Sequence, residues 1–173
     1  PLKSEPRIGE TNAENAQSAG VVVRYGKFTF ANLGDLTWNK EPELFCPQNK
    51  VGKVDVYETP QHGREPTKAV AALEPRMTVM DNAGRKGGDG VRVYSGLPSK
   101  PDVWMLHSNL AAGALNAPES FIANLAEKQP EDQGMYLKLS AREDGSFTVF
   151  NERTGQTRQY PASAGISKLS SSR

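Results

Sequence analysis

The first clear pattern along the chain is an alternation of apolar and polar residues close to its start. Val21–Arg24 and Lys27–Leu33 are rich in β-branched and aromatic residues, and Tyr25-Gly26 separates them. Phe28 and Phe30 fall on one face of the second run, because successive side chains of a strand point to opposite faces. Two such runs joined by a short, glycine-containing turn predict a β-hairpin.

Short apolar runs then alternate with segments of helical period. In Pro66–Leu73 the proline suits a first helical turn, and Val70 and Leu73 share a face. The same reasoning predicts a helix over Pro118–Lys128, with its proline at the first position. The other expected elements are three strands and one helix, namely strands Val54–Thr59, Arg76–Met80 and Asp102–His107 and helix Val91–Leu97.

A second hairpin is expected near the carboxyl end. Met135–Ala141 and Ser146–Asn151 both alternate, and Glu143-Asp144-Gly145 between them is typical of a hairpin turn. Residues 81–90 contain four glycines and are expected to form a loop. Strands interleaved with short helices predict an α/β fold with a sheet, followed here by a terminal antiparallel hairpin.

The two ends of the chain differ in composition from its middle. Residues 1–19 contain only Leu2 and Ile8 as large apolar residues, without a period, and residues 161–173 are small, polar and serine-rich. We therefore expect a loop or tail at 1–19, one ordered unit at 20–160 and a flexible tail at 161–173.

Composition and charge narrow the class of protein. Leu, Ile, Val and Phe make up 34 of 173 residues, close to the level of roughly 20% below which a highly charged chain becomes disordered. The net charge is only +1, so we expect a folded chain with little attraction to nucleic acid or to a membrane surface. The sequence shows no signal peptide and no apolar stretch near the roughly 18 residues of a membrane span, which predicts a soluble chain of undetermined compartment. The single Cys46 excludes an internal disulfide and a cysteine-based zinc cluster.

Two polar side chains that follow predicted strands are the main candidates for chemistry. Asp35 comes just after a strand, where Gly34 lets the backbone turn, and His62 follows Val54–Thr59 in the same way. Strand ends are where α/β proteins place their sites, and carboxylate with imidazole is a ligand set for zinc, iron or manganese. Each residue also has a structural interpretation, the aspartate as a cap and the histidine as a surface group.

Both features lie in the run GKFTFANLGDLTWNKEPELFCPQNKVGKVDVYETPQHG, which begins at Gly26. This run resembles the later half of the metallo-β-lactamase fold, in the branch that includes the hydrolase domain of DNA-uptake competence proteins. In that branch a strand pair ends in Gly-Asp, and Val-Asp-Val, a strand and a His-His-Gly turn follow. Residues 82–88, 103–108 and 121–124 also look like segments of bacterial members. The resemblance extends over roughly residues 10–160 and implies one half of an αββα sandwich, with a mixed sheet and short helices.

The resemblance implies roles for two residues. Asp35 matches the aspartate whose carboxylate bridges two metal ions, and His62 matches the histidine turn that completes the shell of the second ion. The implied metal is zinc, or another divalent ion in its place. Such a pair of ions lowers the pKa of a bound water for attack on an ester, phosphoester or amide. The implied function is metal-dependent hydrolysis, with Asp35 and His62 as metal ligands and catalytic residues.

Two departures from the family pattern limit this expectation. Gln61 stands where the family turn has its first histidine, and if that position is the ligand, His62 is only an outer-shell group. The first family motif, His-x-His-x-Asp-His, is absent, and the chain has two histidines, His62 and His107. We therefore expect the carboxyl-terminal half of a hydrolase, inactive without the amino-terminal motif. The alternative is a non-catalytic binding or structural module that keeps the fold.

The expected partners follow from this half-fold. One half of a sandwich exposes a sheet face, so we expect exposed apolar surface, or the missing amino-terminal half or a second copy covering it. The substrate is expected to be a small molecule or ester of unknown identity, and neither a membrane nor nucleic acid is expected. His107 is a weaker candidate at the same edge as Asp35 and His62. Three glutamates are expected to be surface charges, namely Glu41, Glu43 and Glu58.

Overall fold

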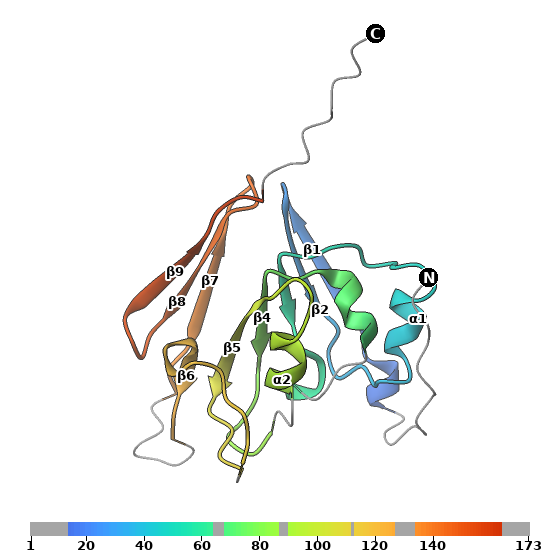
Figure 1. Ribbon diagram of the computed structural model, residues 1–173. Helices are drawn as coiled ribbons and strands as arrows, with labels where there is room; N and C mark the ends of the chain where they lie inside the picture. The colour runs from blue at the N-terminus through green and yellow to red at the C-terminus, as the bar shows by residue number, and fades with distance from the viewer. Residues whose placement is uncertain (1–13, 64–67, 87–89, 112, 127–133, 164–173) are drawn as a thin grey trace.

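A computed structural model of the chain describes residues 14–63, 68–86, 90–111, 113–126 and 134–163. Its main element is a six-stranded mixed sheet whose spatial order follows the sequence from β1 to β6 (Figure 1). β1 is antiparallel to β2, and all the later neighbours are parallel, so the predicted α/β class with a mixed sheet is confirmed. The strands are β1 Val21–Tyr25, β2 Phe28–Asn32, β3 Val56–Glu58, β4 Met77–Met80, β5 Asp102–His107 and β6 Ile122–Asn124.

The predicted first hairpin is confirmed, with its turn one residue later than expected. Tyr25 pairs with Phe28, so Gly26 and Lys27 form the turn. The backbone amide of Lys27 donates to the carbonyl oxygen of Glu143 at 2.8 Å, which brings this turn against the turn of the second hairpin. Gly26 has φ 58°, and a Cβ there would lie 2.3 Å from the same carbonyl oxygen. Both the turn and the contact therefore require glycine.

Short helical segments connect the parallel strands. α1 Glu41–Phe45 follows β2, and α2 Gly90–Ser95 follows β4. The helix predicted over Pro66–Leu73 is a 3₁₀ segment, η3 Lys68–Leu73, while residues 64–67 lie outside the described chain. Three further 3₁₀ segments are η1 Asn15–Gln17, η2 Pro60–Gly63 and η4 Glu119–Phe121. Of the predicted loop at 81–90, residues 81–86 are irregular, 87–89 lie outside the described chain and Gly90 begins α2.

The predicted helix over Pro118–Lys128 is wrong. The chain forms only η4 there and then β6, which pairs in parallel with β5 through Met105–Ile122 and His107–Asn124. Ile122 of β6 is buried in the core. The backbone hydrogen bonds to β5 therefore decide the structure here, against the helix that the spacing of the apolar residues favours. The described part of this segment ends at residue 126.

The predicted carboxyl-terminal hairpin is confirmed and is extended by a third strand. β7 Leu137–Ala141 and β8 Phe147–Asn151 are antiparallel, and β9 Gln156–Tyr160 pairs with β8. The local pattern does not predict β9, because its first four residues are polar, and all four are exposed. Tyr160 attaches it: the ring stacks on Phe147 at a centroid distance of 4.3 Å, and the hydroxyl donates to the Asp102 carboxylate at 2.7 Å.

The core has two parts because the sheet is covered on both faces. The helical segments pack on one face, where Tyr57 and Met105 point, and the β7–β9 sheet packs on the other, where Val56 and Trp104 point. Adjacent residues of β3 and of β5 therefore belong to different parts of the core, as the two-residue period of a strand requires. The order of layers is helices, six-stranded sheet and three-stranded sheet (Figure 1).

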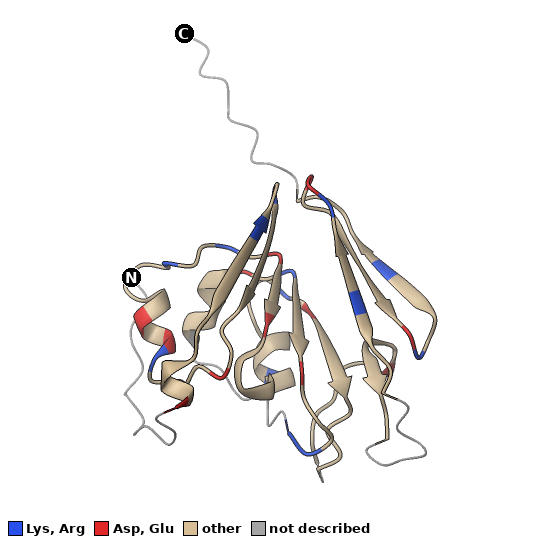
Figure 2. Ribbon diagram, turned by 180° about the vertical axis from the view of Figure 1, so that it is seen from behind, with Lys and Arg blue, Asp and Glu red and all other residues tan. Residues whose placement is uncertain are grey.

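The exposed sheet face expected from a half-sandwich is not found among the described residues, because both faces of the six-stranded sheet are covered. Val21, Val23 and Tyr25 of the edge strand β1 are about half exposed. Acidic and basic segments are interspersed over both sheets (Figure 2). Glu41, expected at the surface, is instead fully buried in the first turn of α1. In the part of the chain that is described, no helix has the length and apolar character needed to cross a membrane.

Candidate functional site

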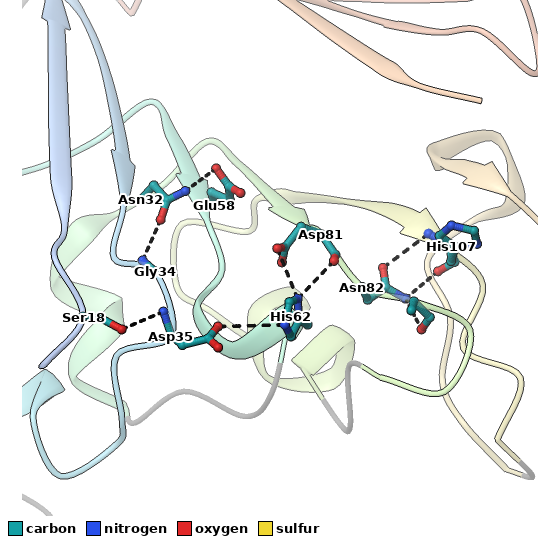
Figure 3. Close-up of polar contacts among 10 residues, drawn as sticks. Ser18, Asn32, Gly34, Asp35, Glu58, His62, Asp81, Asn82 and His107 are labelled. Atoms are coloured by element: carbon teal, nitrogen blue, oxygen red, sulfur yellow. Dashed lines mark hydrogen bonds and ion pairs between the residues drawn. The ribbon is translucent and has the colours of Figure 1, made fainter. Parts of the chain in front are cut away.

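The carboxyl ends of the parallel strands bring the two main candidates together. β2 and β3 are parallel neighbours, so the loops that follow them leave the same edge of the sheet side by side. Asp35 lies in the first loop and His62 in the second (Figure 3). The imidazole Nε2 lies 4.0 Å from Asp35 Oδ1, and the two side chains, His62 and Asp35, are 33% and 42% exposed. A metal ion or a small substrate could therefore reach both groups from solvent.

Backbone hydrogen bonds fix the loop that carries Asp35. The amide of Asp35 donates to the hydroxyl of Ser18 at 3.1 Å, and the amide of Gly34 donates to the side-chain oxygen of Asn32 at 2.6 Å. Gly34 has φ 58°, a conformation that glycine adopts without steric cost. With the backbone of this loop held in place, the Asp35 carboxylate points toward His62 (Figure 3).

The turn that carries His62 has an unusual backbone. Gln61 and His62 have φ 51° and 58°, and Gly63 follows with φ 85°, so three successive residues lie in the left-handed region. Non-glycine residues adopt this region at a cost of roughly 1–2 kcal/mol each. Such strain persists only where the surroundings impose it, and it occurs often at functional sites.

The side chain of Gln61 is one of the contacts that impose this turn. Its amide nitrogen lies 3.2 Å from the carbonyl oxygen of Asp35 and 3.4 Å from that of Leu36, and it donates to both. Gln61 therefore ties the β3 loop to the β2 loop. Of the two adjacent positions in this turn, His62 is the one whose side chain faces the Asp35 carboxylate.

Asp81 is a third residue of the cluster, and it is not among the candidates that the sequence indicated. It directly follows β4 and approaches the other side of the imidazole: His62 Nδ1 lies 3.2 Å from Asp81 Oδ2 and 3.3 Å from the Asp81 carbonyl oxygen. Asp81, like Asp35, comes shortly after the end of a parallel strand, which is a signal that the sequence does contain. The glycine-rich composition of the segment that Asp81 begins obscures this signal, because it is typical of a plain loop.

The acidic character of this edge extends to Glu58 at the end of β3. Asn32 donates to the Glu58 carboxylate at 2.7 Å. Burial raises the pKa of Glu58 above its ordinary value of 4.5, the hydrogen bond from Asn32 lowers it, and the negative charge of Asp81 raises it. Glu58, expected to be a surface charge, is thus half-buried. The negative charges of Glu58 and Asp81 together favour a cation at this edge.

The strand ends further along the edge have structural contacts. The buried side chain of Asn82 donates to the His107 carbonyl oxygen at 2.6 Å and accepts from the His107 amide at 3.4 Å. Asn124 similarly donates to the carbonyl oxygens of Leu106 and Met135. His107 ends β5, which is separated from β3 by β4. These contacts satisfy backbone groups where the ladder stops.

The donor set of Asp35 and His62 fits part of a metal shell. Zinc binds imidazole nitrogen and carboxylate oxygen at about 2.0–2.2 Å in tetrahedral geometry, which places two ligand atoms of one ion roughly 3.3–3.5 Å apart. The 4.0 Å between His62 Nε2 and Asp35 Oδ1 would therefore have to shorten by about half an ångström for both atoms to bind one ion. A metal-ligating histidine usually donates its other N–H to a carboxylate or carbonyl, and Asp81 places both kinds of acceptor within hydrogen-bond distance of His62 Nδ1. Within the described ranges, no group of three or more His, Cys, Asp or Glu side chains is arranged to hold a metal ion. The described residues therefore supply two candidate ligands, Asp35 and His62, and Asp81 contacts the second nitrogen of the His62 ring.

Comparisons with known proteins give no family for this chain. Neither the family models, nor the curated proteins, nor the solved structures contain a match to it.

Proposed function

We propose that this chain contributes part of the metal centre of a hydrolase with the metallo-β-lactamase fold. The observation that carries the proposal is the facing pair of His62 Nε2 and Asp35 Oδ1, 4.0 Å apart at the carboxyl edge of a parallel sheet. Carboxylate and neutral imidazole together are ligands for zinc and related divalent ions. The resemblance of residues 26–63 to the later half of that fold supports the same interpretation.

The chemical roles of the residues follow from their contacts. Asp35 supplies negative charge and two oxygens, which can bridge two cations, and His62 supplies a nitrogen lone pair. A divalent ion held by Asp35 and His62 would supply Lewis-acid chemistry suited to hydrolysis of an ester, phosphoester or amide. Gln61 keeps the two loops together, and the half-buried charge of Glu58 favours a cation. The remaining ligands come from outside the described residues.

Metal binding by the purified chain tests this proposal. We expect weak zinc binding that Asp35→Ala and His62→Ala each reduce about tenfold or more, whereas His107→Ala, a matched histidine control, leaves it unchanged. We also expect little or no hydrolysis of an activated phosphodiester or ester by this chain alone. Equal zinc binding by all four proteins would contradict the proposal. Tight binding of two zinc ions would contradict the view that this chain holds only part of the centre.

The alternative function is a non-catalytic binding or structural module. It is favoured by the finding that the described residues supply only two facing ligands instead of a group of three. This alternative predicts that Asp35→Ala and His62→Ala change neither metal binding nor any activity of the complete protein. The same titration therefore separates the two functions.

A further inference from the structure

The contacts of His62 differ between its two ring nitrogens. Nδ1 lies within hydrogen-bond distance of two oxygens of one residue, the Asp81 carboxylate at 3.2 Å and the Asp81 carbonyl at 3.3 Å. Nε2 faces the Asp35 carboxylate at 4.0 Å, beyond hydrogen-bond distance (Figure 3). A neutral imidazole carries one N–H and one lone pair. Two acceptors at Nδ1 favour the hydrogen on that nitrogen.

We infer that Asp81 is a positioning residue that holds His62 in the Nδ1–H tautomer and keeps the Nε2 lone pair directed toward Asp35. The inference rests on the proposed function in one respect, namely that the lone pair is there to bind a metal ion. The tautomer itself depends only on the contacts within this chain. Asp81 comes from β4, a different strand from those that lead to Asp35 and His62.

Asp81 is well placed to act as a fixed acceptor. It follows Met80, which is fully buried, and precedes Asn82, which is 2% exposed and hydrogen-bonded to both backbone groups of His107. The backbone around Asp81 is therefore held between β4 and β5. Gly63, directly after His62 in the chain, packs so closely that a Cβ would lie 2.2 Å from the Met80 side chain. The backbone of residues 62 and 63 is thus packed against the end of β4.

The tautomer can be measured without any metal. In the metal-free chain labelled with ¹⁵N-histidine, at a pH of about 9 where imidazole is neutral, ¹H–¹⁵N correlations distinguish a protonated from a bare ring nitrogen. The chain has two histidines, so His107→Gln assigns the signals. We expect Nδ1–H at His62 in the unmodified chain, a shift toward Nε2–H in Asp81→Ala, and partial retention in Asp81→Asn, whose amide oxygen still accepts. Predominant Nε2–H in the unmodified chain, or no change in Asp81→Ala, would overturn the inference.

Zinc titration of the same variants provides the second measurement. Asp81→Ala should weaken zinc binding about 10- to 100-fold, the usual effect of removing a histidine-orienting partner. Glu58→Gln measures the general effect of losing a negative charge near Asp81 and should weaken zinc binding by less than about threefold, because the Glu58 carboxylate is bonded to Asn32 and not to the imidazole that Asp81 holds. An equal loss in both variants would show a general charge effect and would overturn the positioning role. If the unmodified chain binds no zinc, the proposed function fails, while the tautomer measurement still decides the role of Asp81.

Discussion

The side-chain amide of Gln61 donates to the backbone carbonyl oxygen of Asp35 across 3.2 Å. This contact joins the two loops that carry the candidate ligands and gives Gln61 a structural role. Gln61 is the first of two adjacent polar residues in this turn, and its orientation leaves the second, His62, as the residue whose imidazole faces Asp35. The proposed metal centre therefore does not depend on a second histidine in this turn.

Substituting Gln61 tests this assignment. Gln61→His should not strengthen zinc binding, because a side chain at this position points to the Asp35 and Leu36 carbonyls and away from the facing pair. Gln61→Ala should lower the free energy of unfolding by about 1 kcal/mol, the usual value of a neutral hydrogen bond. Urea denaturation and zinc titration measure the two effects. A tenfold gain in zinc affinity for Gln61→His would show that position 61 is the ligand position.

Gly63→Ala should be strongly destabilising, because residue 63 has φ 85° and its Cβ would overlap the buried Met80 side chain. We expect a loss of about 2–4 kcal/mol in the free energy of unfolding, from backbone strain and overpacking together. Gly52→Ala is the matched control, since Gly52 has φ 89° but a Cβ added there would meet no atom within 4 Å. It should lose only about 1 kcal/mol. Equal losses, measured by urea denaturation, would mean that the close contact with Met80 contributes nothing.

Glu58→Gln should stabilise the chain at neutral pH and have no effect in acid. The pKa of Glu58 is higher in the folded chain than in the unfolded chain. As pH rises, Glu58 therefore ionises first in the unfolded chain, and the free energy of unfolding falls between the two pKa values. Because Glu58 is only half-buried, we expect a gain of about 0.5 kcal/mol near pH 7 that disappears near pH 4. Urea denaturation at both pH values measures it. A variant that is less stable at neutral pH would contradict the sign.

The chain should unfold in alkali with simultaneous ionisation of its buried tyrosines. Burial raises the pKa of Tyr57 and Tyr94, to which the Glu41 charge adds, and burial followed by the hydrogen bond to Asp102 raises the pKa of Tyr160. Unfolding releases these phenols to ionise near their usual value of about 10, so stability falls as pH rises above about 10. Phenolate absorbance and circular dichroism should therefore change together for these tyrosines. Ionisation of all five tyrosines before any loss of secondary structure would contradict this expectation.

The sequence is informative where local pattern and tertiary packing agree. The alternation in β1, β2, β7 and β8 matches the pairing that the structure shows. The pattern is misleading at Pro118–Lys128, where helical spacing of apolar residues competes with a free strand edge on β5, and at β9, where polar residues pair with β8. In both cases the deciding contact is with another strand, which a local pattern does not contain.

The candidate site could be predicted from the sequence only in part. Strand-end reasoning brings Asp35 and His62 to one edge, where the structure has them 4.0 Å apart. The role of Gln61 depends on three successive left-handed residues, which the sequence PQHG does not reveal. The same strand-end reasoning applied to β4 finds Asp81. To predict its contact with His62 Nδ1, however, one would need to know how β2, β3 and β4 pair.

The most direct test of the central claim is a zinc titration of the metal-free chain observed at the His62 ring nitrogens by NMR. If His62 and Asp35 share a metal ion, the His62 Nε2 signal shifts and saturates, and Asp35→Asn raises the zinc concentration required by about tenfold or more. The His107 signals serve as the internal control. An unchanged His62 Nε2 signal in the presence of zinc, or the same titration curve in Asp35→Asn, would contradict the claim.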